Sequence, residues 1–305
     1  MVKNQLPNFL IIGAAKSGTT SLHEELSKHP EIFMCNPKEP HFLADLPDDT
    51  IGGNYGYPRV DQAGYYALFE NVKEEKVIGE SSVSTLFYKN AIKKAKSLLG
   101  EDIKIVVVLR NPVDRAFSDY MMHVRDGFED KTFEEALELE DVRKKENYWW
   151  GYFLKEAGLY SEQVSNVYAS YDPKQVKVIL FEDLIENREA TLKEICGFLE
   201  VDTGFDFQKA IKSNTSGRPD PKSKSIRFFN SLFMGENILK KIFRYILPKS
   251  IRQSIFDSAK KQLFDANLKK EKMNSETRKS LITYFKSDIQ ELEKLINRDL
   301  SHWLK

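Results

Sequence analysis

Cysteine is scarce in this sequence. The 305-residue chain has two cysteines, Cys35 and Cys196, which are far apart and form no CxxC pair. This spacing supports neither a disulfide framework nor a structural zinc site. We therefore expect both thiols to be reduced.

Long apolar runs and net charge are missing as well. The apolar run from Phe9 to Ile12 is far too short to cross a bilayer, and residues 1–7 hold no apolar stretch of signal-peptide length. Lysine plus arginine equals aspartate plus glutamate at 46 each, so no global positive field attracts nucleic acid. These absences predict a cytoplasmic protein without a transmembrane segment and without nucleic acid as a partner.

What the sequence does contain is a repeated alternation of short apolar runs and helical patterns. The apolar runs occupy residues 8–12, 76–78, 103–109 and 176–181, and a helical pattern follows each of them. Continuous apolar strands separated by helices are typical of a parallel sheet covered on both faces. We predict one α/β domain over residues 1–305 with three layers, a parallel sheet between helices.

Two helix starts and a change of character complete the predicted organisation. Asn111 and Pro112 indicate the start of a helix, with Asp114 placed so that its side chain can bond back to the N–H of the cap residue. Thr132 with Glu135 forms a capping box. Past residue 204 the strand signals stop. The prediction is a core over about residues 5–203, then a lid loop and a C-terminal helical cap over about residues 204–305.

The segment from Gly13 to Thr20 has the composition of an anion-binding loop. Its two glycines bracket a turn between a strand and a helix, where backbone N–H groups can converge on an oxyanion. In the nucleotide-triphosphate pattern GxxxxGK[ST] the lysine follows the second glycine, whereas here Thr19 holds that place and the lysine is Lys16. Ser17, Gly18, Thr19 and Thr20 complete the predicted donor-binding loop. A plain glycine turn with a solvated lysine is the alternative.

The position of Lys16 indicates which chemical group the loop binds. A sulfuryl group leaving a phosphosulfate bears less negative charge than a terminal phosphoryl group, so one lysine at the bridging oxygen suffices and we expect no required metal. Arg110 ends the strand at residues 103–109, and Ser118 follows on the next helix. A guanidinium fork and a hydroxyl suit a second phosphate on the same nucleotide, although Arg110 paired with Asp114 is the structural alternative.

The segments from Gly13 to Leu22 and from Leu109 to Tyr120 together resemble the sulfotransferases that use 3′-phosphoadenosine 5′-phosphosulfate (PAPS), in particular the heparan-sulfate-type and bacterial sulfotransferase-domain proteins. The similarity continues through residues 158–160, 178–184 and 298–303, and so covers nearly the whole chain. It implies a P-loop-NTPase-like sulfotransferase fold and transfer of the sulfuryl group to an acceptor, with release of 3′-phosphoadenosine 5′-phosphate (PAP). In that family the lysine matching Lys16 contacts the sulfonate, and the residues matching Arg110 and Ser118 bind the 3′-phosphate.

A general base for the acceptor is predicted in residues 36–42, which bring Lys38, Glu39 and His41 together. An acceptor hydroxyl or amine loses a proton as it attacks sulfur, and a carboxylate or an imidazole can accept it. The resemblance favours Glu39, because the heparan-sulfate-type enzymes have their catalytic glutamate in a similar Glu-x-His-Phe-Phe stretch. His41 is the alternative, because cytosolic small-molecule sulfotransferases use histidine. Both residues also have a structural alternative, as a surface carboxylate and a half-buried ring.

Ser81 departs from the family pattern. The heparan-sulfate enzymes have a lysine near this position that contacts the sulfonate and the acceptor, and only Lys38 is available to replace it. Heparan-like acceptors are therefore less well supported than sulfotransfer itself. The predicted acceptor is a carbohydrate, a lipid or another small metabolite.

Three weaker signals concern the lid, an aromatic cluster and the cap. Arg218 lies in a basic stretch resembling the family loop that covers the nucleotide, although a solvated charge run has the same composition. Residues 148–153 are rich in aromatic side chains, which line an acceptor pocket or, more often, belong to a core. Residues 226–256 combine phenylalanines with lysines, as in a helix of the cap or in an interfacial helix making peripheral membrane contact.

Two rival functions stay open. Residues 178–183 resemble a strand ending in a magnesium-holding acid, as in a P-loop kinase or NTPase, although the displaced lysine and Arg110 argue against it. The second rival is a nucleotide-binding peripheral membrane protein without turnover. Neither the acceptor nor the oligomeric state is specified by any pattern in the chain.

Overall fold

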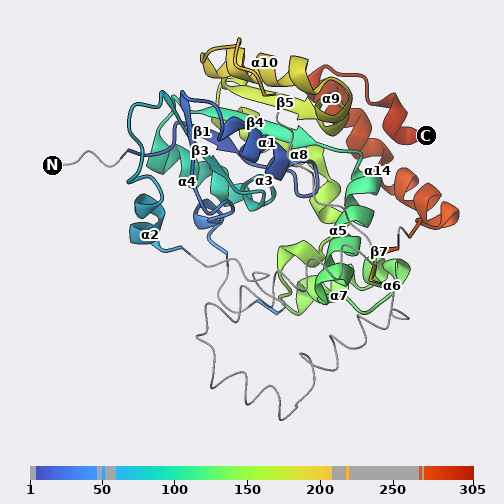
Figure 1. Ribbon diagram of the computed structural model, residues 1–305. Helices are drawn as coiled ribbons and strands as arrows, with labels where there is room; N and C mark the ends of the chain where they lie inside the picture. The colour runs from blue at the N-terminus through green and yellow to red at the C-terminus, as the bar shows by residue number, and fades with distance from the viewer. Residues whose placement is uncertain (1–4, 47–49, 52–59, 208–217, 220–267, 270) are drawn as a thin grey trace. The chain divides into compact units, whose positions relative to one another are not determined.

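The computed structural model describes residues 5–46, 50–51, 60–207, 218–219, 268–269 and 271–305 (Figure 1). The chain divides into two compact units. Unit 1 comprises residues 1–119, 132–213 and 275–305, and unit 2 comprises residues 120–131 and 214–274. The prediction of one domain stays a prediction, and every residue of the site described below belongs to unit 1.

A five-stranded sheet forms the centre of unit 1. Its strands are β1 (Phe9–Ile11), β2 (Ile32–Met34), β3 (Val77–Ser81), β4 (Lys104–Leu109) and β5 (Val176–Leu180). They are parallel and lie in the order β2-β3-β1-β4-β5. Successive residues of a strand point to opposite faces, and β1 and β3 are buried along their whole length, so both faces of the sheet are covered. The predicted α/β class is confirmed, and β2 is an edge strand that sequence analysis missed.

Helices follow the strands as the alternating pattern predicted. Those of the first half are α1 (Thr19–Leu26), α2 (Gln62–Ala67), α3 (Ser84–Phe87), α4 (Lys89–Leu99) and α5 (Pro112–Asp126). Those that follow are α6 (Phe133–Glu138), α7 (Glu140–Lys145), α8 (Tyr160–Ser170), α9 (Phe181–Glu186), α10 (Arg188–Leu199) and α14 (Ser275–Ile296). The single helix predicted after β5 is two helices, α9 and α10.

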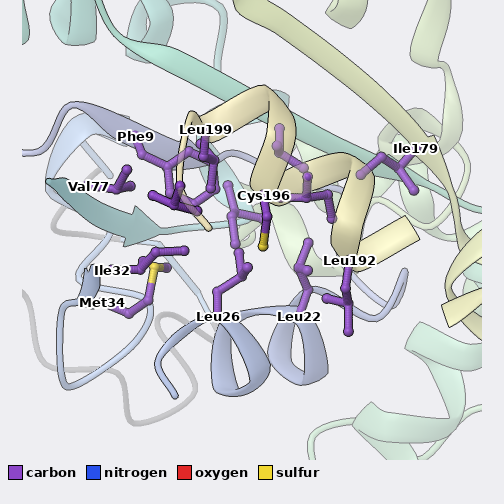
Figure 2. Packing of buried hydrophobic residues seen from close by; sticks show 14 of the residues in the cluster. Phe9, Leu22, Leu26, Ile32, Met34, Val77, Ile179, Leu192, Cys196 and Leu199 are labelled. Carbon is purple, nitrogen blue, oxygen red and sulfur yellow. The ribbon is translucent and has the colours of Figure 1, made fainter. Parts of the chain in front are cut away.

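One face of the sheet is covered by α1 and α10. Figure 2 shows Leu22 and Leu26 of α1 and Leu192 and Leu199 of α10 pointing toward side chains of the strands such as Phe9. All five residues are buried. Burying aliphatic side chains of this size stabilises the fold by about 2 kcal/mol each. This packing holds α1, and with it the preceding loop, against the end of β1.

The two helix starts were predicted correctly from the local sequence, except for the role of Asp114, which bonds a residue far away in the chain. The capping box of Thr132 and Glu135 is present, and the Asn111 side chain accepts a hydrogen bond from the Val113 N–H at 3.0 Å. The prediction that Asp114 bonds back to the cap residue was wrong, because its carboxylate accepts a hydrogen bond from Arg278 of α14 at 2.6 Å. Asp114 therefore bonds an arginine 164 residues away in the sequence and not the backbone at the start of its own helix.

The predicted C-terminal cap is described only in part. Helix α14 packs against α8, where Asp288 accepts hydrogen bonds from the N–H groups of Tyr160 and Ser161 at 2.8 and 3.0 Å. Residues 275–305 thus belong to unit 1. The predicted lid and the segment 226–256 lie outside the described residues, except that the backbone of β6 (Arg218–Pro219) pairs with β7 (Leu268–Lys269) in unit 2. In the described part of the chain, no helix combines the length and apolar character needed to span a bilayer.

Candidate active site

The strand order brings three chemically important segments to one edge of the sheet. Strand β1 lies between β3 and β4, with Ile11 beside Ser81 on one side and beside Val106 on the other. The chain therefore leaves β1 at a switch point between two neighbours, where open parallel sheets form a crevice beyond the strand ends. The loop of residues 13–20 follows β1, Ser82 follows β3 and Arg110 follows β4.

The loop is tied to the sheet by its backbone. The Ala14 N–H donates to the Val108 carbonyl at 2.6 Å, and the Val108 N–H donates to the Gly13 carbonyl at 2.8 Å. Lys16 and Gly18 both have left-handed φ angles, 65° and 87°. Alternation of handedness along a short loop turns successive N–H groups toward one point, which is the geometry of an anion-binding nest.

Ser17 supplies the clearest sign that the loop is built for a ligand. Its side chain is fully buried, and Oγ has no hydrogen-bond partner among the described residues. A buried hydroxyl without a partner costs about 1–3 kcal/mol, and a ligand that supplies the missing partner offsets that cost. An oxyanion held in the loop would satisfy this hydroxyl, and the residues present therefore fit the phosphate end of a nucleotide donor.

Gly18 is required by shape as well as by φ. A Cβ atom added there would lie 3.2 Å from two ring carbons of Phe181, the first residue of α9. The same ring lies 4.7 Å from the centre of the Arg110 guanidinium, in a cation–π contact. Phe181 thus touches both halves of the predicted donor site. Sequence analysis did not single it out, and the one signal was its place directly after a strand.

Arg110 reaches from β4 to the loop. One guanidinium nitrogen donates to the Lys16 carbonyl at 3.1 Å, and the Arg110 carbonyl accepts a hydrogen bond from Tyr160 at 3.0 Å. Burial lowers the pKa of Arg110, opposed chiefly by Asp114, yet guanidinium stays charged in proteins. The alternative pairing with Asp114 is not formed as an ion pair, since Asp114 bonds to Arg278. Ser118 lies half-buried on α5, two turns after the helix start.

The acids after β5 hold the C-terminal segment. Glu182 accepts hydrogen bonds from the Trp303 indole at 2.8 Å and from His302 at 2.6 Å. Asp183 pairs with Arg298 through two bonds of 3.1 Å. Glu182 and Asp183, which resembled a magnesium-holding site, therefore bond the C-terminal segment. These bonds hold the start of α9, including Phe181, in place.

Glu39 lies beside the end of β3. Its backbone N–H donates to the Ser81 carbonyl at 2.9 Å, and its Oε2 accepts from the Val83 N–H at 2.8 Å. Oε1 bonds to the Lys38 ammonium, and the residue is 6% exposed. The structural alternative of a surface carboxylate is wrong, because the residue is buried and bonded at both oxygens.

His41 is held in the same group. Its backbone N–H donates to the Ser82 hydroxyl at 3.1 Å, its Nδ1 bonds to Ser84 at 2.6 Å, and its Nε2 lies 3.7 Å from Glu39 Oε2. Burial, reinforced by the Lys38 charge, lowers the pKa of His41 to about 3. The imidazole is therefore neutral at ordinary pH and a weak proton acceptor.

The aromatic cluster is a core that borders both halves of the site. Trp149, Trp150 and Tyr152 are buried, and Ala15 and Val83 pack against them. Ala15 precedes Lys16 in the loop, and Val83 carries the N–H that bonds Glu39. The cluster thus packs against one residue of the donor loop and against the residue whose N–H bonds Glu39.

Two of the predicted donor residues stand apart: no hydrogen bond among the described residues joins Ser118 to the loop or to Arg110, and Arg218 lies outside unit 1. The Arg218 backbone forms β6 in unit 2, and its side chain lies outside the described residues. Lys16, Ser17, Gly18, Thr19 and Thr20 are contiguous in the loop and at the start of α1, and Arg110 bonds the Lys16 carbonyl. Glu39 and His41 follow β2 along the chain and lie beside the end of β3. Their roles stay predictions.

Comparison with known proteins identifies the family of the chain. Residues 6–283 match the protein family described as the sulfotransferase domain. A crystal structure of a sulfotransferase from Alicyclobacillus acidocaldarius is 32% identical, covers 99% of this chain and 100% of that chain, and superimposes with a TM-score of 0.76.

Among curated proteins, human carbohydrate sulfotransferase 15 is 26% identical over 277 residues, covering 72% of this chain and 49% of that protein. Human heparan sulfate glucosamine 3-O-sulfotransferase 3B1 is 26% identical over 226 residues, covering 70% of this chain and 54% of that protein. The chain thus spans roughly half the length of these curated relatives. With a family match over most of its length and a like fold throughout, this chain belongs to the sulfotransferase domain family.

Proposed function

We propose that this protein transfers the sulfuryl group of PAPS to a hydroxyl or amine acceptor and releases PAP. The observation that carries the proposal is the fully buried, unpartnered Ser17 hydroxyl in a loop that Arg110 bonds from the next strand end. Two anion-binding elements at one edge of a sheet suit a nucleotide with phosphates at both its 5′ and 3′ positions. Family membership supports the same donor.

In this proposal, different residues of the chain bind the two ends of the donor. The N–H groups of the loop and the hydroxyls of Ser17, Thr19 and Thr20 bind the 5′ end, while Arg110 and Ser118 bind the 3′-phosphate. Lys16 neutralises charge that develops on the bridging oxygen. When bound, PAPS supplies an activated sulfur with PAP as its leaving group. Donors of this kind, positioned in advance, lower a barrier because they need no reorganisation during reaction.

The acceptor's proton passes to Glu39 in this proposal. The acceptor oxygen or nitrogen forms a bond to sulfur and gives its proton to the Glu39 carboxylate. The bond from sulfur to the bridging oxygen breaks, and its electron pair leaves on the 5′-phosphate of PAP. His41 is the weaker candidate because burial lowers its pKa to about 3. It bonds Ser84 and faces Glu39, which suits a role in orienting the carboxylate.

A carbohydrate hydroxyl is the acceptor that the relatives favour. Two of them are named as carbohydrate and heparan sulfate sulfotransferases. This chain has Ser81 where the heparan-sulfate enzymes have a lysine, and Lys38 is bonded to Glu39 nearby. We therefore propose a carbohydrate acceptor without committing to the heparan type. No observation favours a kinase, because Glu182 and Asp183 already bond the C-terminal segment.

The test is transfer of labelled sulfate from PAPS to a panel of sugars, lipids, phenols and amines, with products identified by mass spectrometry. We expect a labelled carbohydrate product and protection of the protein from thermal unfolding by PAP. Glu39→Gln should lower kcat by about 10²–10⁴-fold and leave protection by PAP intact. Protection without turnover in the wild type would support a binding protein instead, and magnesium-dependent ATP turnover without protection by PAP would support a kinase.

A further inference from the structure

Trp303 is a buried aromatic residue that the proposed mechanism does not use. It lies in the short 3₁₀ helix η5 (Ser301–Leu304), which follows α14 in unit 1, and it is 1% exposed. Residues 298–303 resemble the sulfotransferases, yet the sequence assigned them no role. The indole N–H and the main-chain carbonyl of Trp303 are both bonded to side chains of distant segments.

The two bonds of Trp303 lead to the ends of two paired strands. The indole N–H donates to Glu182 Oε1 at 2.8 Å, and Glu182 is the second residue of α9, which follows β5. The main-chain carbonyl accepts a hydrogen bond from the Asn111 side chain at 3.2 Å, and Asn111 lies between β4 and α5. Because β4 and β5 pair with each other, Trp303 joins the segments that leave two adjacent strands.

The residues that precede these two bonded side chains belong to the proposed donor site. Glu182 directly follows Phe181, and Asn111 directly follows Arg110. The Phe181 ring lies 4.7 Å from the centre of the Arg110 guanidinium. A cation–π contact requires the cation to lie over the face of the ring. The contact therefore depends on the relative position of the two strand ends, and Trp303 is bonded to both of them.

Tyr160 extends this connection to the backbone of Arg110. Its hydroxyl donates to the Arg110 carbonyl at 3.0 Å, and its ring lies 6.4 Å from the Trp303 ring in an edge-on arrangement. Both aromatic residues are buried. The Arg110 guanidinium in turn donates to the Lys16 carbonyl of the donor loop at 3.1 Å. A continuous series of contacts thus runs from Trp303 to the donor loop.

The segment that carries Trp303 is itself anchored to α9. His302 Nε2 lies 2.6 Å from Glu182 Oε1, the same oxygen that accepts the Trp303 indole N–H. Asp183 pairs with Arg298 through two bonds of 3.1 Å. An arginine that is held in place before its ligand arrives loses less conformational freedom on binding than a mobile one, so its bonds to a phosphate contribute more to affinity.

We propose that Trp303 is a positioning residue, which holds Arg110 in the orientation that binds the second phosphate of the donor. It acts through its bonds to Glu182 and Asn111, which keep the Phe181 ring and the Arg110 guanidinium against each other. This role requires no contact between Trp303 and the donor. The inference rests on the proposed function, because it assumes that Arg110 binds the 3′-phosphate.

The test measures the Kd for PAP by titration calorimetry in variants that break the bond between Trp303 and Glu182. Glu182→Ala removes the acceptor oxygen and should raise the Kd roughly two- to tenfold, the range that corresponds to one hydrogen bond. Removing an acid near a phosphate site would by itself tighten binding of the anion, so a higher Kd is opposite in sign to the effect of charge. Trp303→Phe keeps a buried ring without the N–H and should give a smaller increase, because His302 still bonds Glu182.

Two control variants separate this role from charge and from general packing. Glu182→Gln removes the charge but keeps an oxygen that can accept the indole N–H, so its Kd for PAP should not exceed that of the wild type. Tyr171→Phe removes the hydrogen bond of another buried aromatic residue, which its hydroxyl donates to the Gly100 carbonyl at 3.4 Å. Gly100 precedes β4, whereas Arg110 follows it, so this variant should leave the Kd unchanged.

A double substitution tests whether the effect passes through Arg110. In the Arg110→Ala background, Glu182→Ala should raise the Kd for PAP no further, because the residue that it positions is already missing. A general loosening of the fold would weaken binding in both backgrounds. Adenosine 5′-phosphate, which lacks the 3′-phosphate, should bind Glu182→Ala and the wild type equally.

The outcomes distinguish the two proposals. If the wild type binds PAP and transfers sulfate, an unchanged or lower Kd in Glu182→Ala, or an equal increase with and without Arg110, would overturn the inference and leave the proposed function standing. A wild type that does not bind PAP would overturn both. If Trp303→Phe fails to fold, Glu182→Ala and Glu182→Gln decide the question, because the Glu182 side chain is 27% exposed and its removal leaves no large buried cavity.

Discussion

The donor loop, residues 13–20, and the base segment, residues 36–42, lie beside the ends of the neighbouring strands β1 and β3, yet they are built in different ways. The loop is one continuous segment whose predicted function depends on backbone N–H groups and on the φ angles of Lys16 and Gly18. The base segment is bonded to Ser81 and Val83 of another segment, and its buried side chains include Lys38 and His41, whose pKa values burial lowers. The loop therefore depends on the shape of its backbone, and the base segment depends on the charge of its side chains.

This difference predicts different sensitivities. A backbone cradle changes little with pH, because amides do not titrate in the ordinary range. A group of buried acids and bases changes its charge with pH, and each change alters stability and reactivity together. Substitutions in the loop and at Arg110 should therefore affect donor binding and transfer at every pH, whereas those around the base segment should show a pH dependence.

The largest expected effect is on the donor side. Lys16→Ala removes the cation that neutralises the bridging oxygen and should lower kcat by about 10²–10³-fold at every pH where the wild type is active. Transfer of labelled sulfate measures this. Lys193→Ala removes an exposed lysine that pairs with Glu189 on α10 and serves as the control, with unchanged kcat. Near-normal turnover in Lys16→Ala would contradict the donor assignment.

The surroundings of the base segment should show an effect of pH on stability. His23 beside Lys38 is buried, with its pKa lowered from 6.5 to about 4. Between these values the unfolded chain binds a proton that the folded chain does not, so acidification favours unfolding. His23 should contribute roughly 3 kcal/mol to the loss of stability between about pH 6.5 and pH 4. His23→Gln should flatten this part of the denaturation curve, and parallel curves for the two proteins would refute the prediction.

Arg110 tests the second phosphate of the donor. Arg110→Ala removes charge-assisted hydrogen bonds and should weaken PAP binding by roughly 10–100-fold, equivalent to about 1.5–3 kcal/mol. Titration calorimetry with PAP measures this, and adenosine 5′-phosphate, which lacks the 3′-phosphate, should bind both proteins equally. Arg125→Ala, which removes an arginine bonded to Asp126, is the control. A Kd for PAP unchanged by Arg110→Ala would assign the 3′-phosphate to other residues.

Phe181 should show the smallest effect. Phe181→Leu keeps an apolar side chain beside Gly18 but removes the aromatic face under Arg110. The loss of a cation–π contact of about 0.5–1 kcal/mol should raise the Kd for PAP by roughly two- to fivefold. In the Arg110→Ala background the same substitution should have no further effect, and a full additional loss there would show that Phe181 acts independently of Arg110.

The parts of the site that sequence analysis placed correctly are those whose determinants lie close together in the chain. The loop carries both glycines and its lysine within eight residues, and the capping box of Thr132 and Glu135 spans four. Strands β1, β4 and β5 were predicted from short, mainly apolar runs. Local spacing sufficed because the backbone geometry of a turn or a helix start depends on its own residues.

Contacts across the chain account for what was missed. Asp114 bonds Arg278 instead of its own helix start, and the acids that resembled a metal site bond Arg298, His302 and Trp303. Strand β2, an edge strand that pairs with β3, was also missed. Phe181 joins the predicted donor site only because Gly18 and Arg110 lie against it.

The sequence by itself determined the sulfotransferase family, the donor loop and the segment that holds the candidate base, because each depends on residue types at short spacing. The tertiary structure decided which acids bond the C-terminal segment, that Glu39 is buried and bonded at both oxygens, and that burial lowers the pKa of His41. Those outcomes depend on burial and on charges brought together from distant segments. Burial changes proton affinity in a way that no local pattern records.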